Sequence, residues 1–350
     1  MVGAPAGPVD KRKGHKMEMR CCGQSGIGIS LYGIGAWSFG GGEDDYWGAQ
    51  EQSEVERIVH AALDLGVNYF DTAELYNDGR SEESLGKALR ARRDEAVIGT
   101  KILPQNCSRE GVREHCEASL RRLGTDCVDI YMVHWPLHDH PTPAAFEALM
   151  QLQEEGKIRA IGVSNFDGAR LREALDTGAE IAVNQLHYSL FSRAIEYDAL
   201  PACVEANVGV VGYMPLLQGI LTGKYRTLEE VPWYRLRTRH FSGDRKGARH
   251  GGPGAEEEIV PALEGIHAVA EELGEPMSDV ALAWVAGQPG VACVLAGARD
   301  VAQLEANVRG CGLKLSAEVI GRLNALTDPV KHRLGTDLDY WESPGNSRVR

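Results

Sequence analysis

Short apolar runs alternate along the chain with longer segments whose apolar residues recur at helical spacing. Eight of the runs predict strands, at residues 31–35, 68–71, 96–101, 128–134, 158–163, 182–186, 209–213 and 291–296. Runs such as 128–134 are too apolar for a half-exposed strand, which favours parallel strands covered by helices. The segments between them predict helices at 53–66, 81–91, 108–124, 143–156, 167–177, 197–207, 256–273 and 277–286.

The predicted helix ends carry suitable residues. Ser53 followed by Glu56 has the pattern of a capping box, and Ser81 offers a weaker cap. Glycines stand where helices should terminate with a left-handed residue, at Gly66, Gly124 and Gly156.

Eight strand-then-helix units favour an α/β fold, a (β/α)8 TIM barrel over residues 19–328. A short N-terminal hairpin over 19–22 and 27–29 is expected to close the barrel bottom. Residues 1–18 are predicted to form a flexible extension, and 329–350 a C-terminal tail. A doubly wound sheet is the alternative, but Gly33 and Gly35 do not complete the GxGxxG pattern that such a sheet usually shows after its first strand.

Composition narrows the class of protein. With 43% hydrophobic and 25% charged residues, the 350-residue chain is neither disordered nor fibrous, and no apolar run is long enough to cross a bilayer. A net charge of −13 argues against nucleic acid as a partner. The eight cysteines lack metal-site spacing and suit a reducing compartment. Residues 1–16 lack the apolar core of a secretory signal, which predicts a soluble, cytoplasmic protein, with a transit peptide as the lesser alternative.

One irregular segment, 233–254, is strongly basic. It follows the seventh predicted strand and carries six basic residues against the single acid Asp244. Loops in this position of a barrel often bind phosphate, so the segment is either a solvated excursion or part of a phosphate site.

Polar residues end three consecutive predicted strands, where barrel enzymes place their active sites. These are Asp71, Lys101 and His134, with Tyr76 five residues beyond Asp71. A free phenol has a pKa near 10, and a neighbouring ammonium would lower it toward the range useful for proton transfer. Asp71 can hold Lys101 charged, while His134 can hydrogen-bond a substrate oxygen. The Tyr76 phenol, with its pKa lowered in this way, would donate a proton to a carbonyl oxygen as negative charge develops there.

Six segments resemble the aldo-keto reductase superfamily in order and spacing: NYFDTAELY (68–76), GTK (99–101), VHWP (133–136), GKIRAIGVSNF (156–166), PLLQGILTGKY (215–225) and GARDVAQLEAN (297–307). The resemblance implies reduction of an aldehyde or ketone by hydride transfer from NADPH, without a metal. The family's catalytic tetrad falls on Asp71, Tyr76, Lys101 and His134, with Tyr76 as general acid. The expected partner is therefore a small-molecule carbonyl substrate, with no nucleic acid and no membrane.

The same resemblance assigns the contacts to NADPH/NADP+. The nicotinamide is expected to contact Ser164, Asn165, Gln185 and Tyr213, the last stacking on the ring. The pyrophosphate is expected to contact Pro215, Leu216, Gln218, Gly219 and Lys224. Arg235 or Arg237 of the basic segment would also reach it. The adenosine 2′-phosphate site falls on Gly297, Arg299, Gln303 and Asn307. Ala306 departs from the glutamate that relatives often have, which leaves the adenine contact and the strength of the NADPH preference less determined.

Trp37 and Trp135 are expected to line the substrate pocket. Two other functions stay open at this stage. One is an NADP(H)-binding redox sensor or regulatory subunit with little turnover. The other is a metal-dependent barrel hydrolase that uses His134, His138 and His140, although no HExxH spacing supports it.

Overall fold

Eight parallel strands close into a barrel in the computed structural model, which describes residues 17–349. The strands are β3 (Tyr32–Gly35), β4 (Tyr69–Asp71), β5 (Val97–Ile102), β6 (Val128–Val133), β7 (Ile158–Ser164), β8 (Ile181–His187), β9 (Gly209–Tyr213) and β10 (Val291–Ala296). They pair in chain order, and β10 pairs with β3 to close the ring. The fold is therefore the (β/α)8 TIM barrel, and every strand lies within one residue of its predicted ends.

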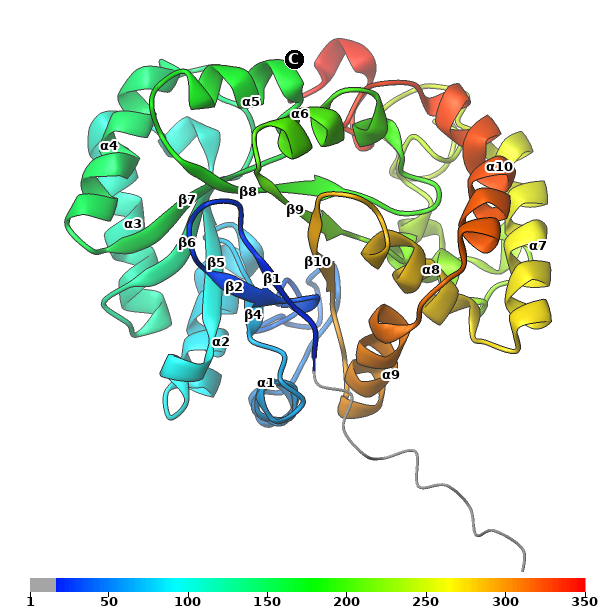
Figure 1. Cartoon of the computed structure of the whole chain (residues 1–350), viewed down its shortest axis with the longest axis horizontal. Coiled ribbons are helices and arrows are strands. Elements are labelled where there is room, and N and C mark those ends of the chain that lie inside the picture. Colours follow the sequence, from blue (N-terminus) through cyan, green and yellow to red (C-terminus); the bar gives the residue numbers. More distant parts are fainter. Residues whose placement is uncertain (1–16, 350) are drawn as a thin grey trace, which may run out of the picture.

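Helices surround the barrel (Figure 1). They are α1 (Gln52–Asp64), α2 (Arg80–Leu89), α3 (Arg109–Leu123), α4 (Thr142–Glu154), α5 (Gly168–Leu175), α6 (Ala199–Glu205), α7 (Glu256–Leu273), α8 (Met277–Ala286), α9 (Val301–Gly312) and α10 (Ala317–Leu334). The eight predicted helices end within two residues of α1 to α8. No helix among residues 17–349 combines the length and the apolarity needed to span a bilayer.

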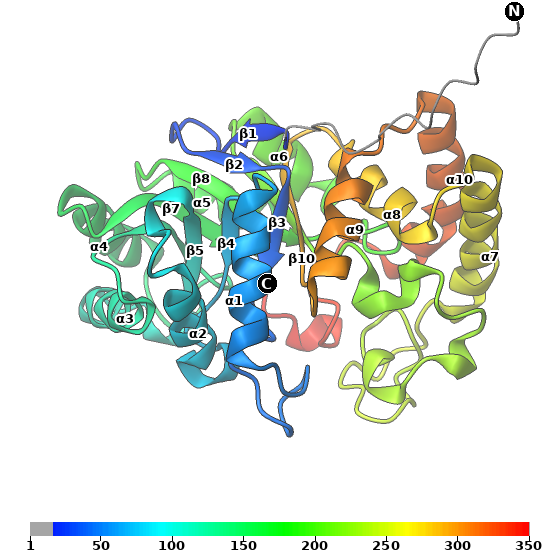
Figure 2. The same cartoon turned by 90° about the horizontal axis from the view of Figure 1, so that it is seen from below.

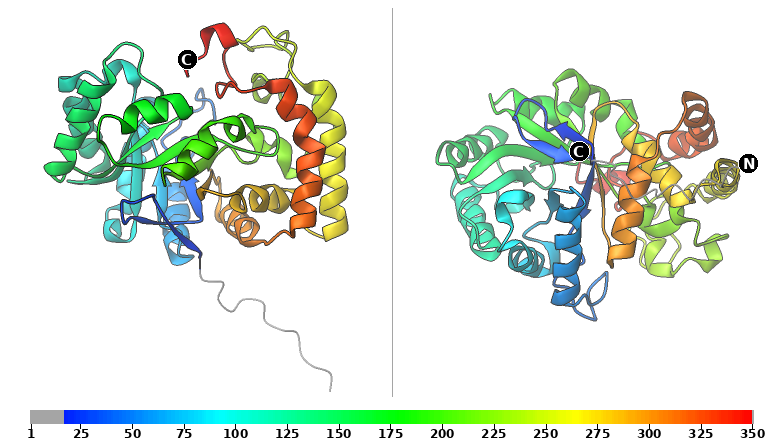
Figure 3. Two further views of the ribbon diagram at one scale, coloured as in Figure 1. Left: turned by 45° about the horizontal axis from the view of Figure 1, so that its top comes forward. Right: turned by 60° about the horizontal axis from the view of Figure 1, so that its bottom comes forward.

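A two-stranded hairpin of β1 (Met19–Cys21) and β2 (Gly28–Ser30) crosses the end of the barrel where the strands begin (Figure 2; Figure 3, right). Its buried Cys22, Ile27 and Ile29 pack in one cluster with barrel residues such as Tyr69 and Val97. The hairpin thus closes the bottom, and the barrel opens at the carboxyl ends of its strands. Most of the predicted extension, residues 1–16, lies outside the described residues.

The helix-end predictions were half right. Gly66, Gly124 and Gly156 have positive φ angles of 81°, 65° and 73° after α1, α3 and α4, which confirms them as terminating residues. The predicted capping box is wrong, because α1 begins at Gln52 and Ser53 already lies inside its first turn. Ser81 is not a cap either. Its hydroxyl donates to the carbonyl of Ala36 at 2.7 Å and so joins the first turn of α2 to the loop after β3.

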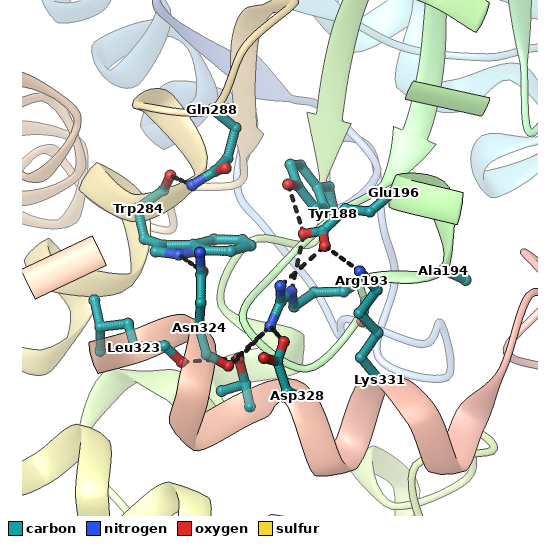
Figure 4. A network of polar contacts seen from close by, with 12 residues as sticks. Tyr188, Arg193, Ala194, Glu196, Trp284, Gln288, Leu323, Asn324, Asp328 and Lys331 are labelled. Carbon is teal, nitrogen blue, oxygen red and sulfur yellow. Dashed lines mark hydrogen bonds and ion pairs between the residues drawn. The ribbon is translucent and has the colours of Figure 1, made fainter. Parts of the chain in front are cut away.

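The boundary predicted at residue 328 falls within α10, so the tail leaves the barrel after Leu334. A polar network fixes this helix to the loop after β8 (Figure 4). The guanidinium of Arg193 donates to Thr327 at 2.9 Å and to Asp328 at 2.8 Å, and Lys331 pairs with Glu196 at 2.7 Å. Beyond α10 the chain returns to the barrel mouth (red in Figure 2), where Trp341 and Arg348 line the central cavity.

Candidate active site

A cavity of about 920 Å³ occupies the carboxyl end of the barrel. Asp71 closes β4, Tyr76 lies in the turn that follows, and His134 comes directly after β6. All three line the cavity, while Lys101 of β5 lies beneath them, 0% exposed. The structure thus brings together the four residues that the sequence analysis proposed as the tetrad.

Lys101 connects the other members of this group. Its ammonium donates to Asp71 Oδ2 and to the Thr72 carbonyl, both at 2.7 Å. It also reaches the hydroxyl of Tyr76 at 3.3 Å. Because a buried charge is stable only when it is paired and hydrogen-bonded, these contacts fix the position of Lys101 below the phenol.

The charges do not act on Tyr76 as predicted. Burial raises the pKa of the Tyr76 hydroxyl well above its usual value, and the negative charge of Asp71 adds to the rise. Burial likewise raises the pKa of Asp71 and lowers that of Lys101, although each partner opposes the shift of the other. The predicted lowering of the Tyr76 pKa is therefore wrong for the protein by itself, first because the phenol is buried and second because the charge of Asp71 lies nearby.

His134 is held as a neutral imidazole beside the phenol. Its ring meets the Tyr76 ring edge-on, with centroids 5.8 Å apart. Burial, followed by the charges of Lys101 and Arg348, lowers its pKa well below 6.5. Its Nδ1 is buried without a hydrogen-bond partner among the described residues. A neutral ring can offer one N–H to a substrate oxygen without adding charge.

The four residues predicted to hold the nicotinamide form one hydrogen-bonded wall of the cavity. Asn165 donates to Ser164 Oγ at 3.0 Å and accepts from the Tyr213 hydroxyl at 2.8 Å. Gln185 Nε2 donates to Asp71 Oδ1 at 2.6 Å, which links this wall to the tetrad. Behind Tyr213 the ring of His187 is stacked, with centroids 5.1 Å apart. The face of Tyr213 is thereby held in position along the cavity.

The predicted pyrophosphate residues line the same cavity after β9: Pro215, Leu216, Gln218, Gly219, Lys224, Arg235 and Arg237. Two donors here are buried and have no partner in the described part of the chain, namely Gln218 Nε2 and Arg235 Nε. Unpaired buried donors are costly, so they suit a ligand that supplies acceptor oxygens. This donor set fits a diphosphate.

The predicted 2′-phosphate residues lie next to this group, after the neighbouring strand β10. Gly297, Arg299, Gln303 and Asn307 all line the cavity, but their polar groups face the protein. The Arg299 guanidinium donates to the carbonyls of Trp47 and Ala49, at 2.7 Å for the latter. Gln303 Oε1 accepts from the Arg299 backbone at 3.0 Å, and Asn307 donates to Gly297. Arg299 therefore fastens the loop between β3 and α1 over this part of the cavity.

Both predicted tryptophans line the cavity beside Tyr76. Trp37 stacks on the Tyr76 ring with centroids 5.5 Å apart, and Trp135 carries the guanidinium of Arg348 at 3.7 Å from its ring centre. The other proposed use of this region, a histidine metal cluster, is not assembled. His138 contacts the Arg348 carbonyl and His140 the Gln105 carbonyl, and no metal-ligating group of three forms within residues 17–349.

Sequence reasoning left several cavity residues unassigned. Tyr46 and Trp47 belong to the loop after β3, Tyr234 to the basic segment, and Trp341 and Arg348 to the tail. Tyr46 crosses the opening, since its hydroxyl bonds Gln218 and lies 3.1 Å from the Tyr234 carbonyl. Paired aromatics within a glycine-rich loop were the available signal for Tyr46 and Trp47.

The fold and the site together describe a (β/α)8 barrel that gathers a phenol, an imidazole and a buried lysine–aspartate pair at the carboxyl end of its strands. The profile of the aldo/keto reductase family matches residues 32–328. The chain belongs to this family.

Individual relatives align with this chain over nearly their whole length. Aldo-keto reductase YhdN of Bacillus subtilis is 33% identical, over 90% of this chain and 96% of its own. The NADH-specific methylglyoxal reductase of Escherichia coli is 33% identical, over 84% and 93%. A crystal structure of an aldo-keto reductase from Klebsiella pneumoniae in complex with NADPH superposes with a TM-score of 0.70 at 29% identity, covering 89% of this chain and 95% of that one.

Proposed function

We propose that the protein reduces an aldehyde or ketone to the alcohol with NADPH, with Tyr76 as the general acid. One observation carries the proposal. A buried lysine joins Asp71 and the Tyr76 hydroxyl, at 2.7 and 3.3 Å, and this hydroxyl faces a cavity beside a neutral histidine. The ammonium beside the oxygen is what allows this phenol to lose its proton, because a positive charge stabilises the phenolate.

NADPH is the cofactor in this proposal. A reduced nicotinamide supplies the hydride when it is bound. Ser164, Asn165 and Gln185 would hold its carboxamide and Tyr213 its ring, while Gln218 and Arg235 bring unpaired donors to the diphosphate. The adenosine 2′-phosphate would lie at Arg299, Gln303 and Asn307. Membership of the family, and the NADPH bound by the Klebsiella relative, support this assignment.

The protein's own groups handle the carbonyl oxygen. That oxygen would lie between the Tyr76 hydroxyl and the His134 ring, so that both polarise the carbonyl. As hydride reaches the carbonyl carbon, the Tyr76 proton passes to the oxygen and yields the alcohol. Lys101 stabilises the phenolate that remains, and Asp71 keeps Lys101 in place. Trp37 and Trp135 exclude water on the substrate side, which strengthens these interactions.

The test is oxidation of NADPH, followed at 340 nm, by purified protein with a panel of aldehydes and ketones. Tyr76→Phe keeps the ring and removes the hydroxyl. We expect it to lose at least a hundredfold in turnover, while NADPH binding, measured by fluorescence titration, changes only a few-fold. Retained turnover in Tyr76→Phe would contradict the assigned acid. Tight NADPH binding without turnover of any carbonyl compound would instead favour the redox-sensing alternative.

A further inference from the structure

The cavity has a surplus of positive charge although the chain carries a net charge of −13. Six cationic side chains line it: Lys224, Arg235, Arg237, Arg249, Arg299 and Arg348. Asp71 is the one carboxylate among the lining residues of the described chain, and it is paired with Lys101. The cavity therefore favours anionic ligands.

The cofactor's phosphates do not account for all six cations. In the closed ring, β6 lies four strands from β10 and so directly across the barrel. Arg299 follows β10, whereas Arg348 is stacked on Trp135, which follows β6. Arg348 thus belongs to the side of the mouth that holds His134 and the proposed substrate pocket, opposite the proposed 2′-phosphate site.

The tail holds Arg348 in a fixed orientation. Its Nε donates to Asp339 Oδ2 at 2.7 Å and its Nη2 to Oδ1 at 2.8 Å. Its backbone carbonyl lies 2.8 Å from His138 Nε2, and the next residue, Val349, is 2% exposed. A guanidinium held along one edge by Asp339 and across one face by the Trp135 ring loses little further entropy when it binds an anion.

The ion pair with Asp339 does not cancel Arg348 for a ligand. The Asp339 side chain is 0% exposed and faces the protein, where it also accepts from the backbone N–H of Trp341 at 3.0 Å. The Arg348 side chain is 39% exposed, and its Nη1 has no partner within residues 17–349. An anion in the pocket therefore meets the guanidinium, while the protein shields the carboxylate. An arginine that served only to anchor the tail would not need this accessible edge.

We propose that Arg348 makes the site selective for carbonyl compounds that carry an anionic group, a carboxylate or a phosphate, away from the reacting carbonyl. This inference rests on the proposed function, and it names the substrate class of the same site. The three aromatic rings of Trp37, Trp135 and Trp341 would enclose the uncharged part of such a substrate.

The test compares matched pairs that differ in charge. Values of kcat/KM are measured with NADPH for 4-carboxybenzaldehyde against 4-formylbenzamide, and for glyceraldehyde 3-phosphate against glyceraldehyde. We expect the anionic member of at least one pair to be preferred about tenfold or more, as a charged hydrogen bond allows. The pair that shows the preference identifies carboxylate or phosphate as the group bound.

Variants assign the preference to Arg348. Arg348→Met should bring the ratio of kcat/KM for the anionic compound to that for its neutral partner close to one, mainly by raising KM of the anionic compound. Arg348→Lys should keep part of the preference. Ser347→Ala is the control for tail order, because it removes the 2.8 Å bond to Asp337 and keeps the arginine. It should retain the ratio. Arg249→Gln removes another cavity cation, together with its 2.7 Å ion pair to Glu342 of the tail, and should lower the ratio less than Arg348→Met does.

The outcomes separate the two proposals. Reduction of the neutral aldehydes with no anionic preference in either pair overturns the role of Arg348 and leaves carbonyl reduction intact. A preference that survives in Arg348→Met, or one lost equally in Ser347→Ala, also overturns it. If no carbonyl compound is reduced at all, the proposed function is wrong and this inference is wrong with it.

Discussion

Gln185 and Asp71 are joined by a hydrogen bond that crosses the barrel. Gln185 Nε2 donates to Asp71 Oδ1 at 2.6 Å from β8, which lies four strands away from β4 and so on the opposite side of the ring. The other oxygen of Asp71 accepts from Lys101. Both oxygens of a carboxylate that is 2% exposed are therefore occupied, one from each side of the site.

Gln185→Met tests this bond. The methionine fills a similar volume but leaves Asp71 Oδ1 without a donor, which should cost about 1–3 kcal/mol in the free energy of unfolding. The pKa of Asp71, which burial already raises, should rise further. Asp71 then stabilises the charged form of Lys101 less well, and kcat should fall about tenfold. Urea unfolding and steady-state kinetics measure the two effects. Unchanged values for both would show that the bond is dispensable.

Lys101→Met should be inactive and much less stable. It leaves the carboxylate of Asp71 buried without its cation, a change that typically costs about 3–5 kcal/mol. The double variant Lys101→Met with Asp71→Asn removes the orphaned charge. We expect it to recover much of the stability in urea unfolding while turnover stays lost. Recovery of turnover along with stability would mean that the lysine acts only in folding.

A variant of Arg299 distinguishes two roles for this residue, binding the 2′-phosphate of NADPH and anchoring the loop between β3 and α1. If it turns from the Trp47 and Ala49 carbonyls to the 2′-phosphate, Arg299→Gln should raise the Kd of NADPH about tenfold or more, as a charged hydrogen bond is lost. The Kd of NADH, which lacks that phosphate, should change much less. Fluorescence titration with both cofactors gives the comparison. Equal losses would assign Arg299 to holding the loop.

Buried histidines should make the protein sensitive to mild acid. Burial lowers the pKa of His187 to about 3, and those of His134 and His240 well below 6.5. The unfolded chain takes up these protons near pH 6.5, so the contribution to stability is fully present above that value. It is lost as the pH falls from 6.5 toward 3, by about 1.4 kcal/mol per pH unit for each histidine.

Urea unfolding between pH 7.5 and 5.5 measures this loss. His187→Gln removes one of the groups and keeps a partner for Ser192, which lies 3.2 Å from the His187 ring. Its unfolding free energy should depend less steeply on pH, by the share of one histidine. An identical slope in wild type and variant would contradict the assignment to His187.

The strands and the tetrad were predictable because their signals are local. A run such as 128–134 is apolar throughout, and strand order alone brings the ends at Asp71, Lys101 and His134 to one face of the barrel. The family motifs then selected the same residues. The structure places all seventeen remaining predicted cofactor and pocket residues on the cavity wall, though their roles stay predictions.

The failures concern contacts that no local pattern encodes. The helix α1 starts at Gln52, one residue before the predicted Ser53, and the loop that leads into it is held by Arg299 from the far end of the chain. The pKa of Tyr76 is raised by burial and by the charge of Asp71, and the strand pattern reveals neither effect. Arg348 reaches the cavity from the tail that follows α10, a helix held in place by the network around Arg193. Such long-range relationships require the folded structure.

The course of the tail also decides how the protein should be handled. Trp341 and Arg348 form part of the cavity wall, and Val349 is buried against the barrel. A tag or surface attachment inserted directly after Val349 would therefore begin beside the pocket and hinder the entry of ligands. The hairpin of β1 and β2 lies at the opposite end of the barrel, so immobilisation through the amino-terminal side leaves the opening free.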